Sequence, residues 1–429
     1  MRFYLAALAV TAGFCPSPAP AQSAAPLDSV QVRLWKEDLA FLRAEMPQRH
    51  TNLFHTMSRS QLDSALGSIE TRLPRLARHQ VIVELQKLAA MIGDGHSNVG
   101  PWRDSLIAFQ TLPVALYWFE EGLVIRAADS AHRSLIGGRV TRIGGMPIDS
   151  AIARVAPLIS RDNEMGPRAY TPFFLVMPEI LHAVGLAASP SESMLAVEKN
   201  GRTTEVRLRA AGKFPMLTGD ADRSWAYRPG FVDARESAPA PLWLSDPLNY
   251  YWYRYLPDTK TLYLQINTIQ QKPADSLSSF MRRAISAADS AGAQRLVLDL
   301  RLNGGGNGSF NRHIMLPIIK SRYDSAGRFF VLTGRRTWSA AQMLVTELEK
   351  YTNATFVGEP TASKANHFGD SYRIVLPNSR ITFRVSTRWH QYRDQRDKRS
   401  MIPPAIPAAL TFADYAAGKD PVLEAALRR

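Results

Sequence analysis

The sequence predicts an α/β fold, chiefly from the pattern of its C-terminal half. Apolar strands are expected there, with helical patterns between them; the strands span 262–266, 295–300, 329–332 and 355–357, and the helices 273–291 and 340–351. Strands that alternate with helices of this length are typical of a mostly parallel sheet covered by helices. The chain has 429 residues, of which 45% are hydrophobic and 21% charged, so it is large enough for two or three domains.

The part of the chain before this core predicts a helical region, which we place at residues 22–105. Apolar residues recur there at helical spacing in three stretches: 27–46, 60–73 and 80–92. Pro47 and Pro74 are expected to end the first two helices. The third is expected to stop at the turn Gly93-Asp94-Gly95-His96, where two glycines make a natural helix end.

Short strands are predicted after this region, over 114–119, 123–127, 194–197 and 204–208. Between them, Gly144 and Gly145 form a turn before a predicted helix at 148–159. This order of elements resembles a PDZ-like domain, which we place at residues 106–215. The α/β core then takes residues 216–429.

The first 21 residues resemble a secretory signal peptide. Arg2 supplies a positive charge, residues 3–14 are apolar, and Ala19-Pro20-Ala21 fits a cleavage site. The apolar segment is too short to span a bilayer, and no longer one follows. We therefore expect an exported protein, periplasmic or secreted, without a membrane span. The single cysteine, Cys15, lies in this segment, so the cleaved chain would lack disulfides, cysteine-bound zinc and a thiol nucleophile.

The charge balance is basic but does not indicate a nucleic-acid partner. Lys and Arg outnumber Asp and Glu by 52 to 38, which gives a net charge of +14. The basic residues are scattered, and no aromatic-basic recognition motif accompanies them. The sequence therefore predicts no nucleic-acid binding.

Two segments of the core have the features of a catalytic centre. The strand at 296–300 runs into Gly304-Gly305-Gly306, and the backbone N–H groups of such a turn can approach a ligand closely enough to help form an oxyanion hole. Ser339 stands where a helix opens, near free N–H groups and the positive end of the helix dipole. That position suits a nucleophile, although a serine there can equally be an ordinary N-cap.

A third segment places Lys364 on a loop after a strand, behind Gly358-Glu359-Pro360-Thr361. A lysine that loses its charge through burial beside a serine can act as a general base. A lysine in a loop can also be no more than a solvated surface residue.

Together, the three segments resemble the tail-specific, or carboxy-terminal-processing, serine protease family. Residues 298–306 match its Leu-Asp-Leu-Arg-Asn-Asn-x-Gly-Gly signature except at Leu302, and residues 339–342 match its Ser-Ala-Ala-Glu run except at Gln342. The family's Gly-Glu-Pro-Thr-like signature is intact, and Lys364 follows Ser339 by 25 residues, which is similar to the family's spacing. The resemblance implies a crotonase-like protease core with Ser339 as nucleophile. It also implies that the oxyanion is held by backbone N–H groups, for which the candidates are those of Gly305, Gly306 and Ala340.

The general base is left open between His96 and Lys364. The glycine that usually follows the family's lysine is absent here, because Ala365-Asn366-His367 follows instead. This stretch resembles a divergent bacterial branch that is also similar to tricorn-type proteases, in which an N-terminal histidine serves as base. His96 is the matching residue, in an Asp-x-His-like turn where Asp94 could orient it; His367 is a third choice.

The predicted function is therefore that of an exported serine endopeptidase, which hydrolyses peptide or protein substrates through an acyl-enzyme and uses no metal or organic cofactor. Two alternatives stay open. One is a catalytically decayed protein that binds peptides or other ligands on the same scaffold. The other is an acyl esterase that uses the same serine.

Overall fold

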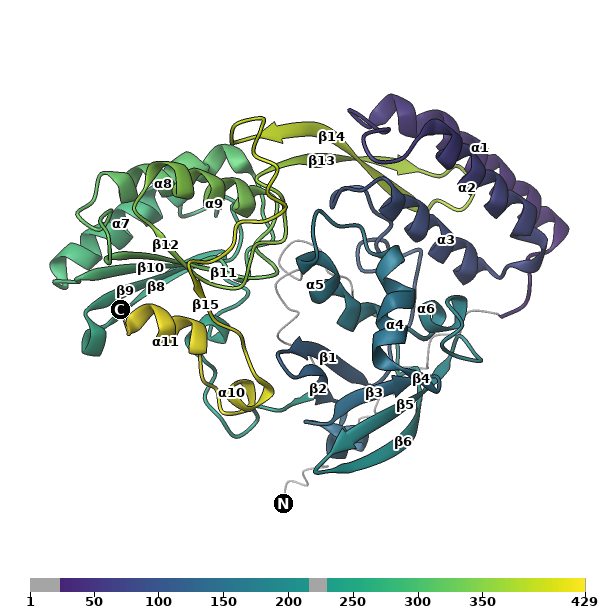
Figure 1. Ribbon diagram of the computed structural model, residues 1–429, viewed down its shortest axis with the longest axis horizontal. Coiled ribbons are helices and arrows are strands. Elements are labelled where there is room, and N and C mark those ends of the chain that lie inside the picture. Colours follow the sequence, from purple (N-terminus) through teal and green to yellow (C-terminus); the bar gives the residue numbers. More distant parts are fainter. Residues whose placement is uncertain (1–23, 216–229, 429) are drawn as a thin grey trace, which may run out of the picture.

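A computed structural model describes residues 24–215 and 230–428, so the predicted signal peptide lies outside the described residues. Two lobes lie side by side, and a long two-stranded ribbon runs between them along one edge (Figure 1). The helices are α1 (Ser29–Arg49), α2 (Arg59–Arg72), α3 (Arg78–Met91), α4 (Ile148–Val155), α5 (Met165–Phe174), α6 (Pro178–Ala183), α7 (Leu277–Ser290), α8 (Asn311–Ile319), α9 (Ala340–Tyr351), α10 (Phe412–Ala416) and α11 (Pro421–Leu427). None of the helices in these described ranges combines the length and apolar character needed to cross a bilayer.

The C-terminal lobe is built on a six-stranded sheet with the order β15-β12-β11-β10-β9-β8. Its strands are β8 (Tyr251–Leu256), β9 (Thr261–Ile266), β10 (Arg295–Asp299), β11 (Phe329–Thr333), β12 (Thr355–Gly358) and β15 (Ile406–Pro407). All neighbours pair in parallel except β8, which pairs antiparallel with β9 at the edge. The α/β class predicted from the sequence is confirmed.

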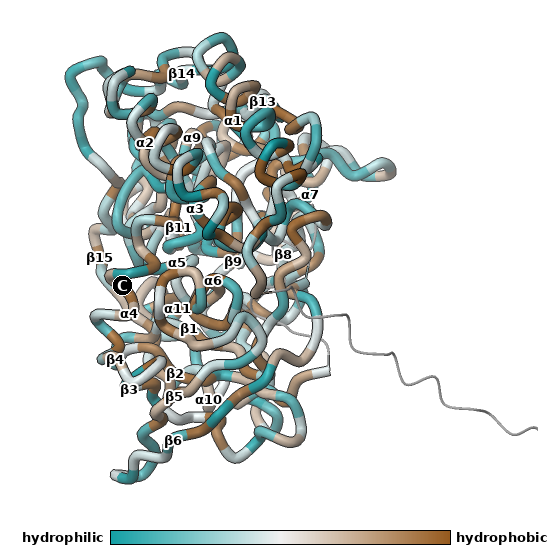
Figure 2. Tube along the Cα trace, turned by 90° about the vertical axis from the view of Figure 1, so that its right-hand side faces the viewer, coloured by the Kyte–Doolittle hydropathy of each residue, from teal (hydrophilic) through white to brown (hydrophobic). Residues whose placement is uncertain are grey.

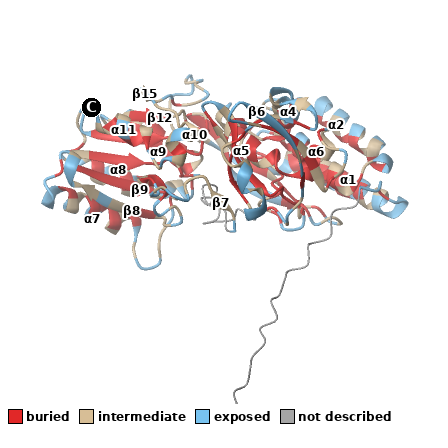
Figure 3. Ribbon diagram, turned by 90° about the horizontal axis from the view of Figure 1, so that it is seen from below, coloured by how far each residue is buried: buried red, intermediate tan, exposed pale blue. Residues whose placement is uncertain are grey.

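Both faces of this sheet are covered, which explains its near-continuous apolar strands. Successive side chains of a strand point to opposite faces. Leu296 and Leu298 of β10 pack in one core with α7, α8 and α9, whereas Val297 packs in a second core with α11. The strands are accordingly buried along most of their length (Figure 3).

The N-terminal lobe holds a seven-stranded antiparallel sheet together with α1 to α6. The strands are β1 (Val114–Phe119), β2 (Gly122–Ala128), β3 (Arg139–Ile143), β4 (Met146–Pro147), β5 (Glu192–Lys199), β6 (Arg202–Arg209) and β7 (Val232–Asp233). Leu39 of α1, Leu85 of α3, Ile125 of β2 and Ile180 of α6 belong to a single hydrophobic core. The hydrophilic segments lie mainly on the outer bends of the chain (Figure 2).

The ribbon consists of β13 (Asn366–Val375) and β14 (Thr382–Gln391), which pair antiparallel. Its far end reaches the N-terminal helices (Figure 1). Asn98 and Arg384 exchange backbone hydrogen bonds of 3.1 and 2.9 Å, and the Thr51 N–H donates to the Ser386 carbonyl at 3.1 Å. Because Asn98 follows His96 by two residues, the ribbon holds the turn that carries His96 against the C-terminal lobe.

The predicted end of the first helix at Pro47 was wrong, because α1 continues through Pro47 to Arg49. The fixed φ of proline fits a helix, and this close to the end its missing N–H removes only one hydrogen bond. The helix predicted at 273–291 begins later, at Leu277, where the Ser276 side chain accepts the Ser279 N–H as an N-cap. The sequence pattern did not indicate the strands β3, β4, β7, β8 and β15, the helices α5, α6, α8, α10 and α11, or the ribbon.

Candidate active site

Ser339 stands at a sharp turn between β11 and α9. Its backbone has φ 56° and ψ −125°, a strained conformation for a residue with a side chain. Its side chain makes no capping hydrogen bond, so the geometry does not support the ordinary N-cap interpretation. A serine on a strained strand-to-helix turn is the arrangement that exposes Oγ in hydrolases with a nucleophile elbow.

His96 lies directly against this serine. Its Nε2 is 2.9 Å from Ser339 Oγ, although 243 residues separate the two in the chain. The turn that carries His96 depends on Gly93, whose φ is +87°. A Cβ on Gly93 would lie 2.6 Å from Thr56 Oγ1, so both the conformation and the space at this position favour glycine.

The ring of His96 is held by stacking. It lies nearly parallel to the Trp338 indole, with 3.9 Å between centroids and 19° between planes, and it also stacks on His367 at 5.9 Å. Its buried Nδ1 has no hydrogen-bond partner among the described residues. Burial, and then the neighbouring His367, lower the pKa of His96 to about 3. The imidazole is therefore neutral at pH 7, as a base must be before it accepts a proton.

Asp94 organises the turn rather than the ring. Its carboxylate accepts the backbone N–H of His96 at 3.0 Å and of Ser97 at 2.7 Å, the Ser386 hydroxyl at 2.6 Å, and His50 Nε2 at 3.0 Å. Burial alone would raise the pKa of Asp94, but these hydrogen bonds hold it well below its usual range. Asp94 therefore positions the backbone of His96, as its hydrogen bond to the His96 N–H shows, and makes no hydrogen bond to the imidazole ring.

His50, His55 and Asp94 lie close enough to suggest a metal site, since their ligand atoms are all within 4.8 Å of one another. The hydrogen bonds favour a different interpretation. His50 Nδ1 accepts the Asn52 N–H at 2.9 Å, so its proton is on Nε2, which donates to Asp94. A protonated Nε2 has no lone pair for a metal ion, and this cluster is better described as a hydrogen-bond network.

The glycine turn packs against Ser339. A Cβ on Gly305 would lie 2.7 Å from the Ser339 Cβ, so this close approach requires glycine. The Gly305 N–H, however, donates to Asn303 Oδ1 at 2.9 Å and is already engaged. Ala340 is the first residue of α9, so its N–H has no partner within the helix. The Ala340 N–H is therefore a better candidate than that of Gly305 to receive an oxyanion, and Gly306 stays a candidate from the sequence.

Lys364 and His367 lie near the pair but not on the serine. Lys364 is half-buried and lines a second cavity with Asp94, Asp162 and His367. No hydrogen bond joins Lys364 to Ser339 in the described part of the chain. His367 Nδ1 donates to the Lys364 carbonyl at 3.0 Å, and burial lowers the pKa of His367 to about 4.

Sequence reasoning missed Asp162, which lies in the loop before α5. Its Oδ1 accepts the Gly95 N–H at 3.0 Å, next to His96. Burial, and then the Asp94 carboxylate, raise the pKa of Asp162 to about 6. The next residue, Asn163, donates to the carbonyls of Thr361 and Ser400 at 3.0 and 2.7 Å and so fastens this loop to the C-terminal lobe. The sequence of this loop contains no recognisable motif. Only the adjacent polar residues Asp162 and Asn163 could have pointed to a role in the site.

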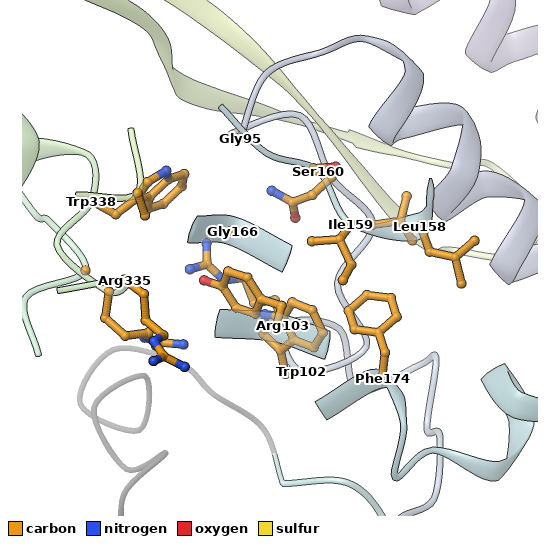
Figure 4. A pocket seen from close by; sticks show the side chains of 16 residues that line it. Gly95, Trp102, Arg103, Leu158, Ile159, Ser160, Gly166, Phe174, Arg335 and Trp338 are labelled. Atoms are coloured by element: carbon orange, nitrogen blue, oxygen red, sulfur yellow. The ribbon is translucent and has the colours of Figure 1, made fainter. Parts of the chain in front are cut away.

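A cavity is lined by residues of both lobes (Figure 4). Its wall includes residues next to the pair in the chain, Gly95 and Trp338, and residues of the N-terminal lobe, among them Trp102, Leu158, Tyr170 and Phe174. The cavity thus lies where the two lobes meet.

The sequence matches no protein-family model and no curated protein. Among solved structures, the chain resembles mature CPAF complexed with lactacystin, at 14% identity and a TM-score of 0.62, with 93% of this chain and 98% of that chain covered. The likeness shows that the two chains share a fold.

Other similar structures are the photosystem II D1 C-terminal processing protease and the tricorn protease. The first has 14% identity and a TM-score of 0.37, with 91% of this chain and 96% of that chain covered. The second has 12% identity and a TM-score of 0.36, with 92% of this chain and 36% of that chain covered.

Proposed function

We propose that the chain is a divergent tail-specific serine endopeptidase, exported to the periplasm or secreted. The observation that carries the proposal is the 2.9 Å approach of His96 Nε2 to Ser339 Oγ at a strained strand-to-helix turn. The motifs at residues 298–306 and 339–342 support the same activity.

In the proposed reaction, the Ser339 hydroxyl gives its proton to His96 Nε2 while Oγ attacks the carbonyl carbon of the scissile peptide bond. The N–H groups of Gly306 and Ala340 stabilise the oxyanion that forms. The C–N bond then breaks, and His96 returns the proton to the leaving amine. Water attacks the acyl-enzyme with His96 again as base, which releases the acid and restores Ser339.

His96 is favoured as the base over Lys364 on geometry and on charge. His96 touches Ser339 and is neutral at pH 7 because burial lowers its pKa. Lys364 is only half-buried, and it lines a separate cavity with Asp94, Asp162 and His367 instead of contacting Ser339.

The finer architecture is also part of the proposal. The C-terminal lobe would be a crotonase-like core, and residues 106–215 a PDZ-like domain that binds an extended peptide by strand addition. The sheet has β1 and β6 at its edges, and β6 is largely exposed. Thr203→Pro and Thr204→Pro each remove one backbone N–H from β6. Neighbouring N–H groups of a strand point in opposite directions, so only one of the two variants loses an N–H that faces away from the sheet. That variant should bind long peptides more weakly. Unchanged KM values in both variants would argue against strand addition.

Ser339→Ala tests the nucleophile. The variant should fold normally but lose peptide hydrolysis and labelling by a fluorophosphonate, because Oγ forms the covalent bond in both reactions. Hydrolysis of a fluorogenic peptide and of a simple ester by the wild type would separate a peptidase from an esterase. Wild-type turnover by Ser339→Ala would remove the proposal.

His96→Ala and Lys364→Ala test the base. His96→Ala should lower kcat by several orders of magnitude, whereas Lys364→Ala should have little effect. Because burial lowers the pKa of His96, the acid limb of kcat/KM for the wild type should lie below pH 6.5. If Lys364→Ala loses far more activity than His96→Ala, Lys364 would be the base. If both variants keep near-normal turnover, neither residue is the base and His367 would be the next residue to test.

A further inference from the structure

The cavity in Figure 4 adjoins every segment of the proposed catalytic centre. Its wall contains Gly95, Gly304 and Trp338, and each of these directly precedes a site residue, as the pairs Gly95-His96, Gly304-Gly305 and Trp338-Ser339 show. A peptide bond placed at Ser339 Oγ would therefore have one of its flanking side chains at the mouth of this cavity.

The far side of the cavity is aromatic and aliphatic. Trp102 stacks on Tyr170 at 5.3 Å and 6°, and Phe174 meets Trp102 edge-on at 5.5 Å and 71°. Leu158 and Ile159 complete this wall, and Figure 4 shows their side chains close to Phe174. Such a wall favours a large apolar side chain, which gains from leaving water and from contact with the rings.

The charged groups of the cavity do not suit a basic side chain. Arg103, Arg335 and Arg336 line it, and none of the described lining residues is Asp or Glu. Arg335 is paired with Glu359 outside this lining, and the Arg336 guanidinium lies 5.3 Å from the centre of the Tyr170 ring. A lysine or arginine side chain buried here would face three arginines and no lining carboxylate, and burying a charge without a partner is costly.

We infer that this cavity is the specificity pocket for the substrate side chain next to the scissile bond. It accepts apolar residues such as Phe, Leu and Met, and it rejects Lys and Arg. The inference rests on the proposed peptidase function and adds the class of substrate. Burial of one large side chain should favour such sites about 10- to 100-fold in kcat/KM over sites with alanine.

Digestion of β-casein tests the preference, with cleavage sites mapped by mass spectrometry. The wild type should cut beside large apolar residues and rarely beside Lys or Arg. Ser160 lines the cavity, so Ser160→Glu would place a carboxylate there and should raise cleavage beside Lys and Arg about tenfold relative to Phe and Leu. Ser290→Glu, the same change on the exposed end of α7, should leave the pattern unchanged.

Binding to Ser339→Ala separates this inference from the proposed function, because it needs no catalysis. Two acetylated, amidated alanine pentapeptides with a central Phe or a central Lys serve as probes. The Phe peptide should bind at least about fivefold more tightly by calorimetry. If the Phe peptide binds more tightly but the wild type hydrolyses no peptide, the specificity pocket would be supported and the proposed peptidase activity would be wrong. Equal affinities for the two peptides would contradict the inferred specificity, and so would cleavage sites that are not enriched in large apolar residues. Both tests hold even if Ser160→Glu fails to fold.

Discussion

Ser339 is one of six non-glycine residues with a positive φ in the described part of the chain, and its ψ of −125° lies outside the left-handed helical region. A positive φ with a side chain costs roughly 1–3 kcal/mol and persists only where the surroundings fix it. Here the buried helix α9 follows at once, and Gly305 packs against the Ser339 Cβ. In this conformation Oγ makes no cap hydrogen bond and lies 2.9 Å from His96 Nε2.

Trp338 takes the place of a carboxylate in holding His96. No acid contacts His96 Nδ1 among the described residues, while the indole lies parallel to the imidazole at 3.9 Å. An aromatic face attracts a cation, so it should stabilise the imidazolium of His96 that the proposed reaction would form. Trp338→Leu should therefore lower kcat about tenfold, and Trp338→Phe less, in steady-state assays with a fluorogenic peptide. Equal losses of kcat in the two variants would show that the aromatic face is not what matters.

At the scale of elements, the turn after α3 is fixed mainly by one buried carboxylate. Asp94 joins that turn to α1 through His50 and to β14 through Ser386. Its loss would leave several buried donors without an acceptor. The ribbon and the turn therefore act as one unit that sets the position of His96.

Asp94→Ala should lower the free energy of unfolding by on the order of 3–5 kcal/mol and also lower kcat, because the His96 turn would no longer be held. Asp38 provides a matched control. It is equally buried and accepts the N–H groups of Asn378 and Ser379 at 2.8 and 2.9 Å, at the far turn of the ribbon. Asp38→Ala should destabilise the fold but leave kcat per folded molecule near normal. The measurements are urea unfolding and active-site titration, and a normal kcat in Asp94→Ala would contradict the positioning role.

The elements that the sequence predicted well are those whose pattern is local. The strands of the core, α9 and the glycine turn follow from apolar runs and from residues with special backbone needs, such as Gly305. The ribbon was missed because β13 and β14 mix exposed and buried residues and gain their order from pairing with each other and with Asn98. The choice between His96 and Lys364 likewise depends on contacts 243 residues apart, which no local pattern contains.

At the scale of the whole molecule, the candidate site is assembled from both lobes. The N-terminal lobe supplies His96, Asp162 and much of the cavity wall, and the C-terminal lobe supplies Ser339 and the glycine turn. The proposed activity therefore depends on the stability of the N-terminal lobe, whose core joins the helices and the antiparallel sheet.

Glu179 makes the stability of this lobe depend on pH. It is fully buried in α6, and its two oxygens accept the Gln110 N–H at 2.9 and 3.1 Å. Burial raises the pKa of Glu179 from 4.5 to about 7. Between these pH values the folded chain keeps a proton that the unfolded chain has released. The contribution of Glu179 to the free energy of unfolding therefore falls as pH rises through this window and is constant above it.

Glu179→Gln should remove this dependence, because the amide has no charge to bury and its oxygen can still accept the Gln110 N–H. We expect the variant to match the wild type near pH 4.5 and to exceed its free energy of unfolding by on the order of 1–3 kcal/mol at pH 8, in urea titrations. The nearby pair His79 and His182 also titrates, but its effect cancels in the difference between the two proteins. Glu164→Gln, at an exposed side chain, should show no such difference at either pH. A difference between Glu179→Gln and the wild type that stays equal from pH 4.5 to pH 8 would mean that folding does not raise the pKa of Glu179.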